Sequence, residues 1–176
     1  MQEILDRIKE KVCSKGLKLG AVLTVQEVEA FEKKYSITLP EGYREFLLQI
    51  GNGGDGPPYY NLHSLGGIPD DYHMSEYGDK LTRKFPFKEG WVWEEEEETP
   101  ELNEKLDQTE YGNLILGTDG CGMYWILIVT GEERGQIWNT ADVGIQPCCP
   151  GVSFLEWYEY WLDGGEDWWR DFVYEE

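Results

Sequence analysis

Cysteine, histidine and basic residues are scarce in this sequence of 176 residues, which has 4 Cys, 2 His and 15 Lys+Arg against 35 Asp+Glu. The cysteines show neither the paired spacing of a zinc knuckle nor a disulfide framework. No apolar run approaches the ~20 residues that a membrane-spanning helix needs. The first residues are charged throughout, unlike a secretory signal. We therefore expect reduced thiols, no structural metal and a cytoplasmic location.

The motifs of common catalytic and nucleotide-binding sites are missing as well. The glycine-rich stretches GNGGDG and GTDGCG lack the lysine of a P-loop, and the Rossmann spacing is absent. His63 or His73 could be combined with Ser64 or Ser75 on paper, but no nucleophile-elbow motif supports such a triad. We expect no cofactor and no catalysis. A carboxylate-dependent hydrolase stays open, because a sequence does not show how far apart two carboxyl groups lie.

The acidity is concentrated in the second half of the chain. Residues 1–88 carry 12 basic and 13 acidic side chains, whereas residues 89–176 carry 3 and 22, together with all 8 tryptophans. Such a field repels nucleic-acid phosphates and anionic membranes, and it attracts basic proteins. We expect a basic protein partner and neither a nucleic acid nor a membrane. The alternative is that the acidity only keeps the protein in solution.

Helical patterns dominate the first fifty residues. Residues 3–13 place their apolar side chains on one helical face. Thr24 and Glu27 have the spacing of a capping box, which predicts the start of a second helix. Pro40 suits the first turn of a third helix, and the glycine-rich residues 51–54 end it.

Strand patterns follow after a loop-rich middle. We expect residues 55–90 to form loops with short strands, such as one over Tyr59 to Leu62. Glycine turns then separate three β-rich runs, which predict an antiparallel meander over residues 114–116, 123–130 and 136–139. The middle run is almost continuously apolar, so we expect it to be covered on both faces.

Two more helices complete the expected fold. Residues 101–110 form one acidic helical pattern, and Ser153 with Glu156 repeats the capping-box spacing at the start of the last helix. Helices, then strands, then a helix predict the α+β class. We expect a single domain over residues 1–176, in which N-terminal and C-terminal helices pack on a mostly antiparallel sheet.

The stretch WVWEEEEETPE sets two tryptophans beside five glutamates. At strand spacing Trp91 and Trp93 point to the same side, and Val92 points to the other. We expect the two rings to face the core and Val92 to face solvent. The glutamates that follow form either a solvated loop or a surface for a basic partner.

The ordered combination of these patterns resembles the SUKH superfamily of Smi/Knr-type proteins. The matching parts are LTVQEVEAFEKKYSITLPEGYREFLLQIGNGG, then LGTDGCGMYWILIV, then SFLEWYEYWLDG. The resemblance covers about residues 20–165 and leaves an acidic, aromatic tail over residues 166–176. It implies an α+β fold with helices on a mostly antiparallel sheet.

The resemblance also implies a role. Bacterial members of the superfamily are understood as immunity proteins that neutralise toxin domains, often nucleases, and some fungal members regulate cell-wall synthesis through protein interactions. We expect a toxin inhibitor, with a regulatory adaptor as the alternative. Carboxylates can occupy a basic cleft built for phosphates, and tryptophans serve as anchors. The residues that we expect to contact the partner are Glu94, Glu95, Glu96, Glu97, Glu98, Asp119, Trp168 and Trp169.

Overall fold

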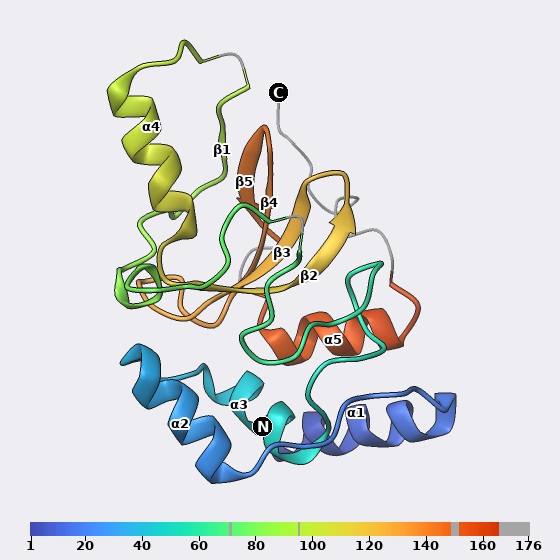
Figure 1. Cartoon of the computed structure of the whole chain (residues 1–176). Coiled ribbons are helices and arrows are strands. Elements are labelled where there is room, and N and C mark those ends of the chain that lie inside the picture. Colours follow the sequence, from blue (N-terminus) through green and yellow to red (C-terminus); the bar gives the residue numbers. More distant parts are fainter. Residues whose placement is uncertain (71, 95, 149–151, 166–176) are drawn as a thin grey trace.

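A five-stranded antiparallel sheet with the strand order β1-β5-β4-β3-β2 is the centre of the computed structural model (Figure 1). The structure describes residues 1–70, 72–94, 96–148 and 152–165. The helices are α1 (Gln2–Lys15), α2 (Val25–Tyr35), α3 (Glu41–Gln49), α4 (Pro100–Asp107) and α5 (Phe154–Leu162). The strands are β1 (Trp91–Val92), β2 (Asn113–Gly120), β3 (Met123–Ile128), β4 (Ile137–Ala141) and β5 (Gly144–Pro147). The expected α+β fold is confirmed.

Local sequence signals set the ends of several helices. Thr24 and Glu27 form the expected capping box of α2, in which the Thr24 side chain accepts from the Glu27 backbone N–H. Ser153 and Glu156 form the second capping box, at the start of α5. Thr99 caps α4 by accepting from the Leu102 backbone N–H at 3.1 Å. Each of these bonds satisfies a backbone donor that the first turn of a helix leaves without an intrahelical partner.

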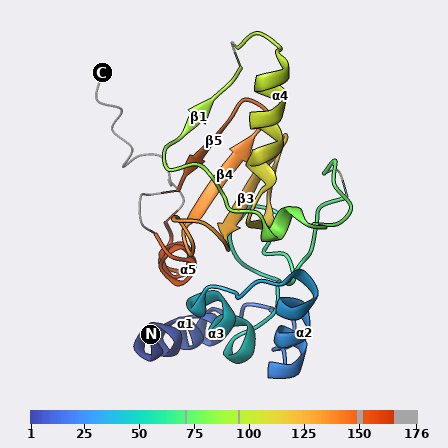
Figure 2. The same cartoon turned by 90° about the vertical axis from the view of Figure 1, so that its left-hand side faces the viewer.

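One face of the sheet packs against the N-terminal and C-terminal helices. Trp125 and Leu127 of β3 meet side chains of α1, α3 and α5 in one buried cluster. Phe46 of α3 is 0% exposed and packs edge-to-face on Phe154 and Tyr158 of α5, with centroid distances of 5.0 Å and 4.8 Å. Figure 2 shows these helices together at one end of the molecule, away from α4.

The other face of the sheet has a smaller core. Ile126, Ile128 and Trp138 form it together with Phe85 and Phe87, which precede β1. Residues of β3 therefore contribute to both clusters in alternation, as expected for an interior strand that is covered on both faces. Helix α4 and β1 lie side by side at the far end of the molecule from α1, α2 and α3 (Figures 1 and 2).

The expected strand over Tyr59 to Leu62 is wrong. Only Leu62 pairs, through an isolated bridge to Gly54. The backbone turns here instead, because Asn61 has a φ of 75° and donates to the Pro58 carbonyl at 2.9 Å. The Tyr60 and His63 N–H groups donate to the carbonyls of β2, so this loop covers the edge of the sheet.

Strand β5 is not among the predicted strands. Its sequence GIQP is short and contains both a glycine and a proline, which are depleted in strands. The strand forms because it lies between β4 and β1 and pairs with both. In contrast, β2 is longer than expected and continues to Gly120, so that Cys121 and Gly122 make the turn into β3.

Among the described residues, Cys13 and Cys121 are free and exposed, and Cys148 is buried. Within the same residues, no three His, Cys, Asp or Glu side chains gather as metal ligands. Of the helices in the described ranges, none has the length and apolar character to cross a bilayer.

Candidate functional site

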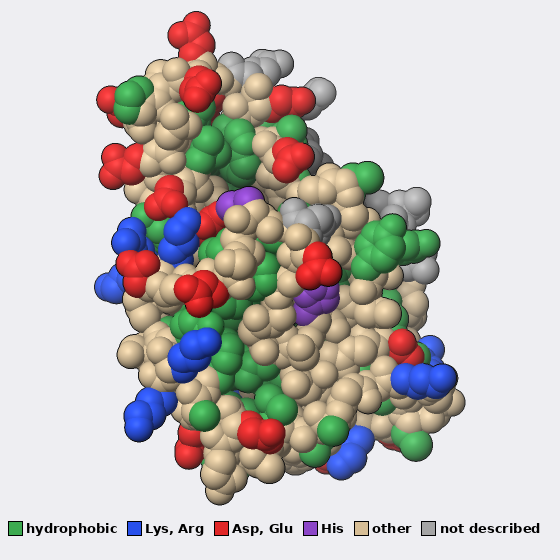
Figure 3. Space-filling model, in the orientation of Figure 1, with side chains coloured by type: hydrophobic (Ala, Val, Ile, Leu, Met, Phe, Trp, Pro, Cys, Tyr) green, Lys and Arg blue, Asp and Glu red, His purple; other side chains and the backbone are tan. Residues whose placement is uncertain are grey.

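Acidic side chains are exposed along the connection from β1 to α4. Glu94, Glu96, Glu97 and Glu98 lie on this connection, and all four are exposed. Glu101 and Glu104 extend the series along α4 and are exposed as well. We call these six residues the acidic edge. Figure 3 shows acidic side chains gathered over this end of the molecule, whereas lysines and arginines lie lower on the same face.

The acidic edge forms no ion pair within the described residues. Because its carboxylates are not neutralised internally, the edge presents a negative field to any approaching protein. The expectation that these glutamates contact a partner stays a prediction. Three residues of the same expectation, Glu95, Trp168 and Trp169, lie outside the described residues.

Trp91 lies at the inner side of the acidic edge and is half-buried. Its ring stacks on Phe87 at 5.7 Å, and its Nε1 donates to Glu96 Oε1 at 2.7 Å. The ammonium group of Lys105 lies 3.6 Å from the centroid of the same ring. Trp91 thus joins the core through one part of its ring and the acidic edge through another.

Trp93 points to the same side as Trp91, as the strand spacing predicts, and Val92 between them is 69% exposed. The Trp93 ring packs at 4.8 Å from the Trp91 ring and is half-buried. Its Nε1 donates to the backbone oxygen of Asp142 at 2.7 Å, and its backbone N donates to the Val143 carbonyl at 2.9 Å. The two rings therefore contact the second core cluster without being fully covered by it.

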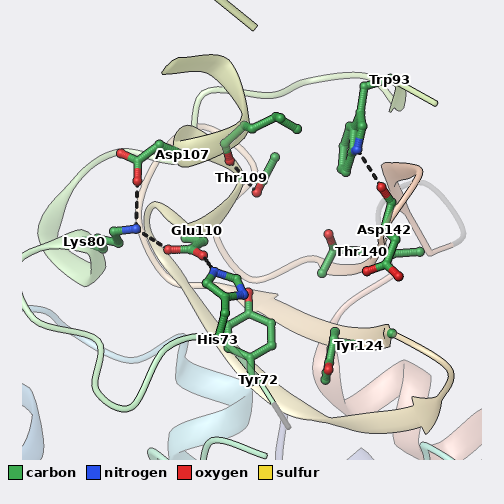
Figure 4. A pocket seen from close by; sticks show the side chains of 13 residues that line it. Tyr72, His73, Lys80, Trp93, Asp107, Thr109, Glu110, Tyr124, Thr140 and Asp142 are labelled. Carbon is green, nitrogen blue, oxygen red and sulfur yellow. Dashed lines mark hydrogen bonds and ion pairs between the residues drawn. The ribbon is translucent and has the colours of Figure 1, made fainter. Parts of the chain in front are cut away.

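A cavity of about 600 Å³ opens beside Trp93, where the acidic edge begins. The floor comes from β3 and β4 and includes Tyr124 and Thr140 (Figure 4). The loop before β1 and the end of α4 supply the opposite side. We call this space the Trp93 cavity, and it is lined by Tyr72, His73, Lys80, Trp93, Leu106, Asp107, Thr109, Glu110, Gly122, Tyr124, Thr140, Ala141 and Asp142.

A chain of charged groups forms one wall of the Trp93 cavity. Glu110 is only 7% exposed, and its two carboxylate oxygens contact His73 and Lys80 (Figure 4). Lys80 also binds Asp107 at 2.8 Å. Burial lowers the pKa of Lys80, but hydrogen bonds to Asp107 and Glu110 outweigh burial and raise it overall. Lys80 therefore stays positively charged and holds both carboxylates in place.

The same wall is supported from behind. The hydroxyl group of Tyr111 donates to Asp107 at 2.6 Å, and Arg83 donates to that hydroxyl at 2.7 Å. Hydrogen bonds from Lys80 and Tyr111 lower the pKa of Asp107. The wall is a pre-formed network in which each charge has a partner. Neither Ser64 nor Ser75 lines the cavity, so the triad considered for the histidines does not form there.

Asp119 is the remaining residue that the sequence predicts as a partner contact. Its Oδ1 accepts from the Tyr59 backbone N–H at 2.7 Å, and its Oδ2 accepts from Trp125 Nε1 at 2.6 Å. It thereby fixes the loop that holds Tyr59 and Tyr60, which are 81% and 59% exposed. The structure thus gives Asp119 an internal role, and a contact with a partner stays a prediction.

Sequence reasoning missed the residues of the Trp93 cavity other than Trp93 and His73. Glu110, Lys80 and Asp142 come from three separate segments, and none belongs to a recognisable motif. The one available signal was the acidic residue Glu110, which lies shortly before β2 and is itself buried in the structure. A buried carboxylate needs partners, and only the folded chain shows that His73 and Lys80 supply them.

The comparison with protein families gives a match to the SMI1 / KNR4 family (SUKH-1) over residues 23–159. The match spans α2, α3, the sheet and most of α5, and it includes the acidic edge and the Trp93 cavity. Comparisons with curated proteins and with solved structures give no match. Because the family match covers most of the chain and agrees with the α+β fold, this protein belongs to the SMI1 / KNR4 (SUKH-1) family.

Proposed function

We propose that this protein is a non-catalytic cytoplasmic immunity protein that binds a toxin domain with a basic cleft, such as a nuclease, and neutralises it. The observation that carries the proposal is the acidic edge, whose carboxylates are exposed and have no internal cations among the residues that the structure describes. A nuclease cleft is basic because it binds phosphates, and exposed carboxylates can occupy the same positions. Family membership supports the proposal, since it places the chain among the Smi/Knr-type proteins.

Exposed aromatic side chains supply the second requirement of a tight complex. Tyr59 and Tyr60 stack edge-to-face at 5.0 Å, and the hydrogen bond from Tyr59 to Asp119 holds their loop. Tyrosine is enriched among the residues that dominate binding energy, because it buries a large area at a low entropic cost. We infer that these tyrosines anchor the partner while the acidic edge guides its approach.

The direct test is capture of the partner by three tagged proteins: the wild type, an acidic-edge variant and a matched control. The edge variant combines Glu94→Gln, Glu97→Gln and Glu98→Gln. The control combines Glu10→Gln, Glu29→Gln and Glu41→Gln, which removes the same charge from exposed positions on α1, α2 and α3. Each protein is incubated with lysate of the source organism at low and at high salt, and bound proteins are identified by mass spectrometry.

We expect the wild type and the control to retain one basic, toxin-like protein that high salt releases. The edge variant should lose it. The purified partner should then be toxic when expressed alone and harmless when expressed with the wild type. Equal capture by the edge variant and the control would contradict the acidic mechanism.

A regulatory adaptor of the Smi/Knr type is the second candidate, and the family match alone favours it equally. It predicts a partner that is not toxic and that stays bound at high salt. A hydrolase is the weakest candidate, because it needs an acid with a raised pKa. Among the described carboxylates, those with a displaced pKa all have it lowered: Glu27, Asp79, Asp107, Glu132 and Glu159.

A further inference from the structure

Trp91 shows how this protein holds a cation on an indole ring. The Lys105 ammonium group lies 3.6 Å from the centroid of the ring, and Glu96 accepts a hydrogen bond from the ring N–H at 2.7 Å. The negative face of an indole attracts a cation, and a nearby carboxylate strengthens the attraction. An indole ring with a carboxylate close to it is therefore a cation-binding arrangement that the fold already contains.

Trp93 and Asp142 set a second indole ring beside an acidic residue, here through a hydrogen bond to its backbone oxygen. The hydrogen bond from Trp93 Nε1 to the Asp142 backbone oxygen fixes the indole beside this residue. Both residues line the Trp93 cavity, together with Thr140 (Figure 4). Within the part of the chain that the structure describes, the Asp142 carboxylate has neither a hydrogen bond nor an ion pair. It differs in this respect from Glu96, which Trp91 already engages.

The opposite wall of the cavity does not supply the missing cation. Lys80, the lysine of the lining, is held by Asp107 at 2.8 Å and by Glu110. Three carboxylates line the cavity with this one lysine, and the buried Glu110 makes its second contact to His73. The charge of the lining therefore favours a positive group that enters from outside.

We propose that the Trp93 cavity receives an arginine side chain of the protein partner, with the guanidinium against the Trp93 ring and its N–H groups donating to the Asp142 carboxylate. A guanidinium is planar, stacks on aromatic rings and matches a carboxylate with two parallel hydrogen bonds, whereas an ammonium group is a compact and strongly hydrated charge. The cavity of about 600 Å³ lies within the usual size range of ligand sites and leaves room for residues that flank the arginine.

This inference rests on the proposed function, because it requires a partner with a basic protein surface. It adds a specific anchor to that function. The acidic edge acts at long range and does not distinguish lysine from arginine, whereas the cavity should do so. A complex that used both would associate quickly through the edge and dissociate slowly because of the arginine held in the cavity.

The test is an NMR titration of the full chain with acetyl-Gly-Arg-Gly-amide. Two further peptides replace the arginine by lysine or by citrulline, a neutral group of the same shape. The indole N–H signal of Trp93, assigned with Trp93→Phe, and the backbone amides of residues 140–143 report on the cavity. We expect saturable shifts with the arginine peptide at concentrations up to about 10 mM. The citrulline peptide should bind at least about fivefold more weakly.

Two variants with the same loss of charge separate the cavity from the general field. Asp142→Asn should weaken binding of the arginine peptide about tenfold, because it removes the carboxylate of the guanidinium pair. Glu97→Gln removes one charge from the acidic edge outside the cavity and should change binding less than about twofold. Equal binding of the arginine and citrulline peptides, no saturable shift at Trp93, or equal effects of the two variants would overturn the inference.

The outcome can be distinguished from a failure of the proposed function. If Asp142→Asn captures the toxin as well as the wild type does, the cavity inference fails and the immunity role stands. If no toxin is captured by any protein but the peptide discrimination holds, the immunity role fails and the arginine site remains.

Discussion

The two faces of the sheet differ in how completely their aromatic side chains are covered. On the face that packs against α1, α3 and α5, Trp157 and Phe46 are each 0% exposed. On the face near α4, Trp138 is buried as well, but Trp91 and Trp93 are half-buried, and Trp93 lines the cavity. A closed face contributes mainly stability, and an incompletely covered face can accept a ligand or a partner.

Charges differ between the two regions in the same way. On the helical side, Glu159 accepts from Arg7 at 2.8 Å and from Lys11 at 2.9 Å. On the other side, Asp142 and the glutamates of the acidic edge have no cation within the described ranges. Glu159, at the interface of two helices, is therefore neutralised internally, whereas Asp142 and the acidic edge are not, as far as the described residues extend.

The largest expected effect tests the closed face. Phe46→Ala should lower the free energy of unfolding by about 3–5 kcal/mol, because it leaves a cavity among Phe154 and Tyr158. Trp93→Ala should cost about half as much or less, because its ring is already partly exposed. Urea titration followed by circular dichroism measures both. Equal losses would mean that the face near α4 is as tightly packed as the helical face.

A smaller effect is expected at Asp119, on the loop that covers the edge of β2. Asp119→Ala should lower the free energy of unfolding by about 1–3 kcal/mol, because it removes the acceptor of a hydrogen bond from the buried Trp125. Asp119→Asn keeps one acceptor oxygen and should cost less. Urea titrations of both variants measure these losses. An Asp119→Ala protein as stable as the wild type would show that Asp119 does not stabilise the fold.

The ion pairs of Glu159 on the helical side should make the free energy of unfolding depend on pH. Hydrogen bonds from Arg7, together with those from Lys11, lower the pKa of Glu159 to about 2, although burial acts in the opposite direction. The lowered pKa contributes stability above about pH 4.5, and this contribution is lost as the pH falls towards 2. Glu159→Gln should therefore cost about 1 kcal/mol at pH 6, a value that allows for solvent screening, and progressively less at lower pH.

The control for this pH dependence is Glu41→Gln, which changes an exposed acid on α3. Its free energy of unfolding should differ from that of the wild type by a small amount at every pH between about 2 and 6. A difference between Glu159→Gln and the wild type that does not shrink in acid would show that the pairing with Arg7 and Lys11 is not its cause.

The smallest effect on stability is expected at the acidic edge. The variant with Glu94→Gln, Glu97→Gln and Glu98→Gln should unfold within about 0.5 kcal/mol of the wild type, because exposed acids without partners hold nothing in place. A modest gain would follow from reduced repulsion between like charges. A decrease of more than about 1 kcal/mol in its free energy of unfolding would show that the glutamates stabilise the fold. A loss of binding by this variant would then not report on the surface alone.

The sequence predicted those parts of the fold that depend on local signals. The capping boxes at Thr24 and Ser153 began helices where expected, because they satisfy backbone donors with side chains three residues away. The run that forms β3 was predicted as a covered strand because nearly all of its side chains are apolar. The family resemblance rested on the same local patterns and is confirmed by the match over residues 23–159.

Elements that depend on neighbours were predicted poorly. Strand β5 has a sequence unsuited to a strand and forms because β4 and β1 pair with it on both sides. The loop at Tyr59 has tyrosines typical of a strand, but Asn61 turns its backbone, and Asp119, sixty residues later, accepts from the Tyr59 N–H. In both cases partners that are distant in the sequence hold the segment in place.

By itself, the sequence determined the α+β class, the family and the acidic character of the second half, because caps, periodicity and charge are properties of short segments. The tertiary structure alone decided which acids have cations and which do not. Glu159 is neutralised because α5 lies beside α1, and Asp142 lines a cavity because a turn between two strands meets Trp93. Pairing of charges depends on distances through space, and those are set only when the chain has folded.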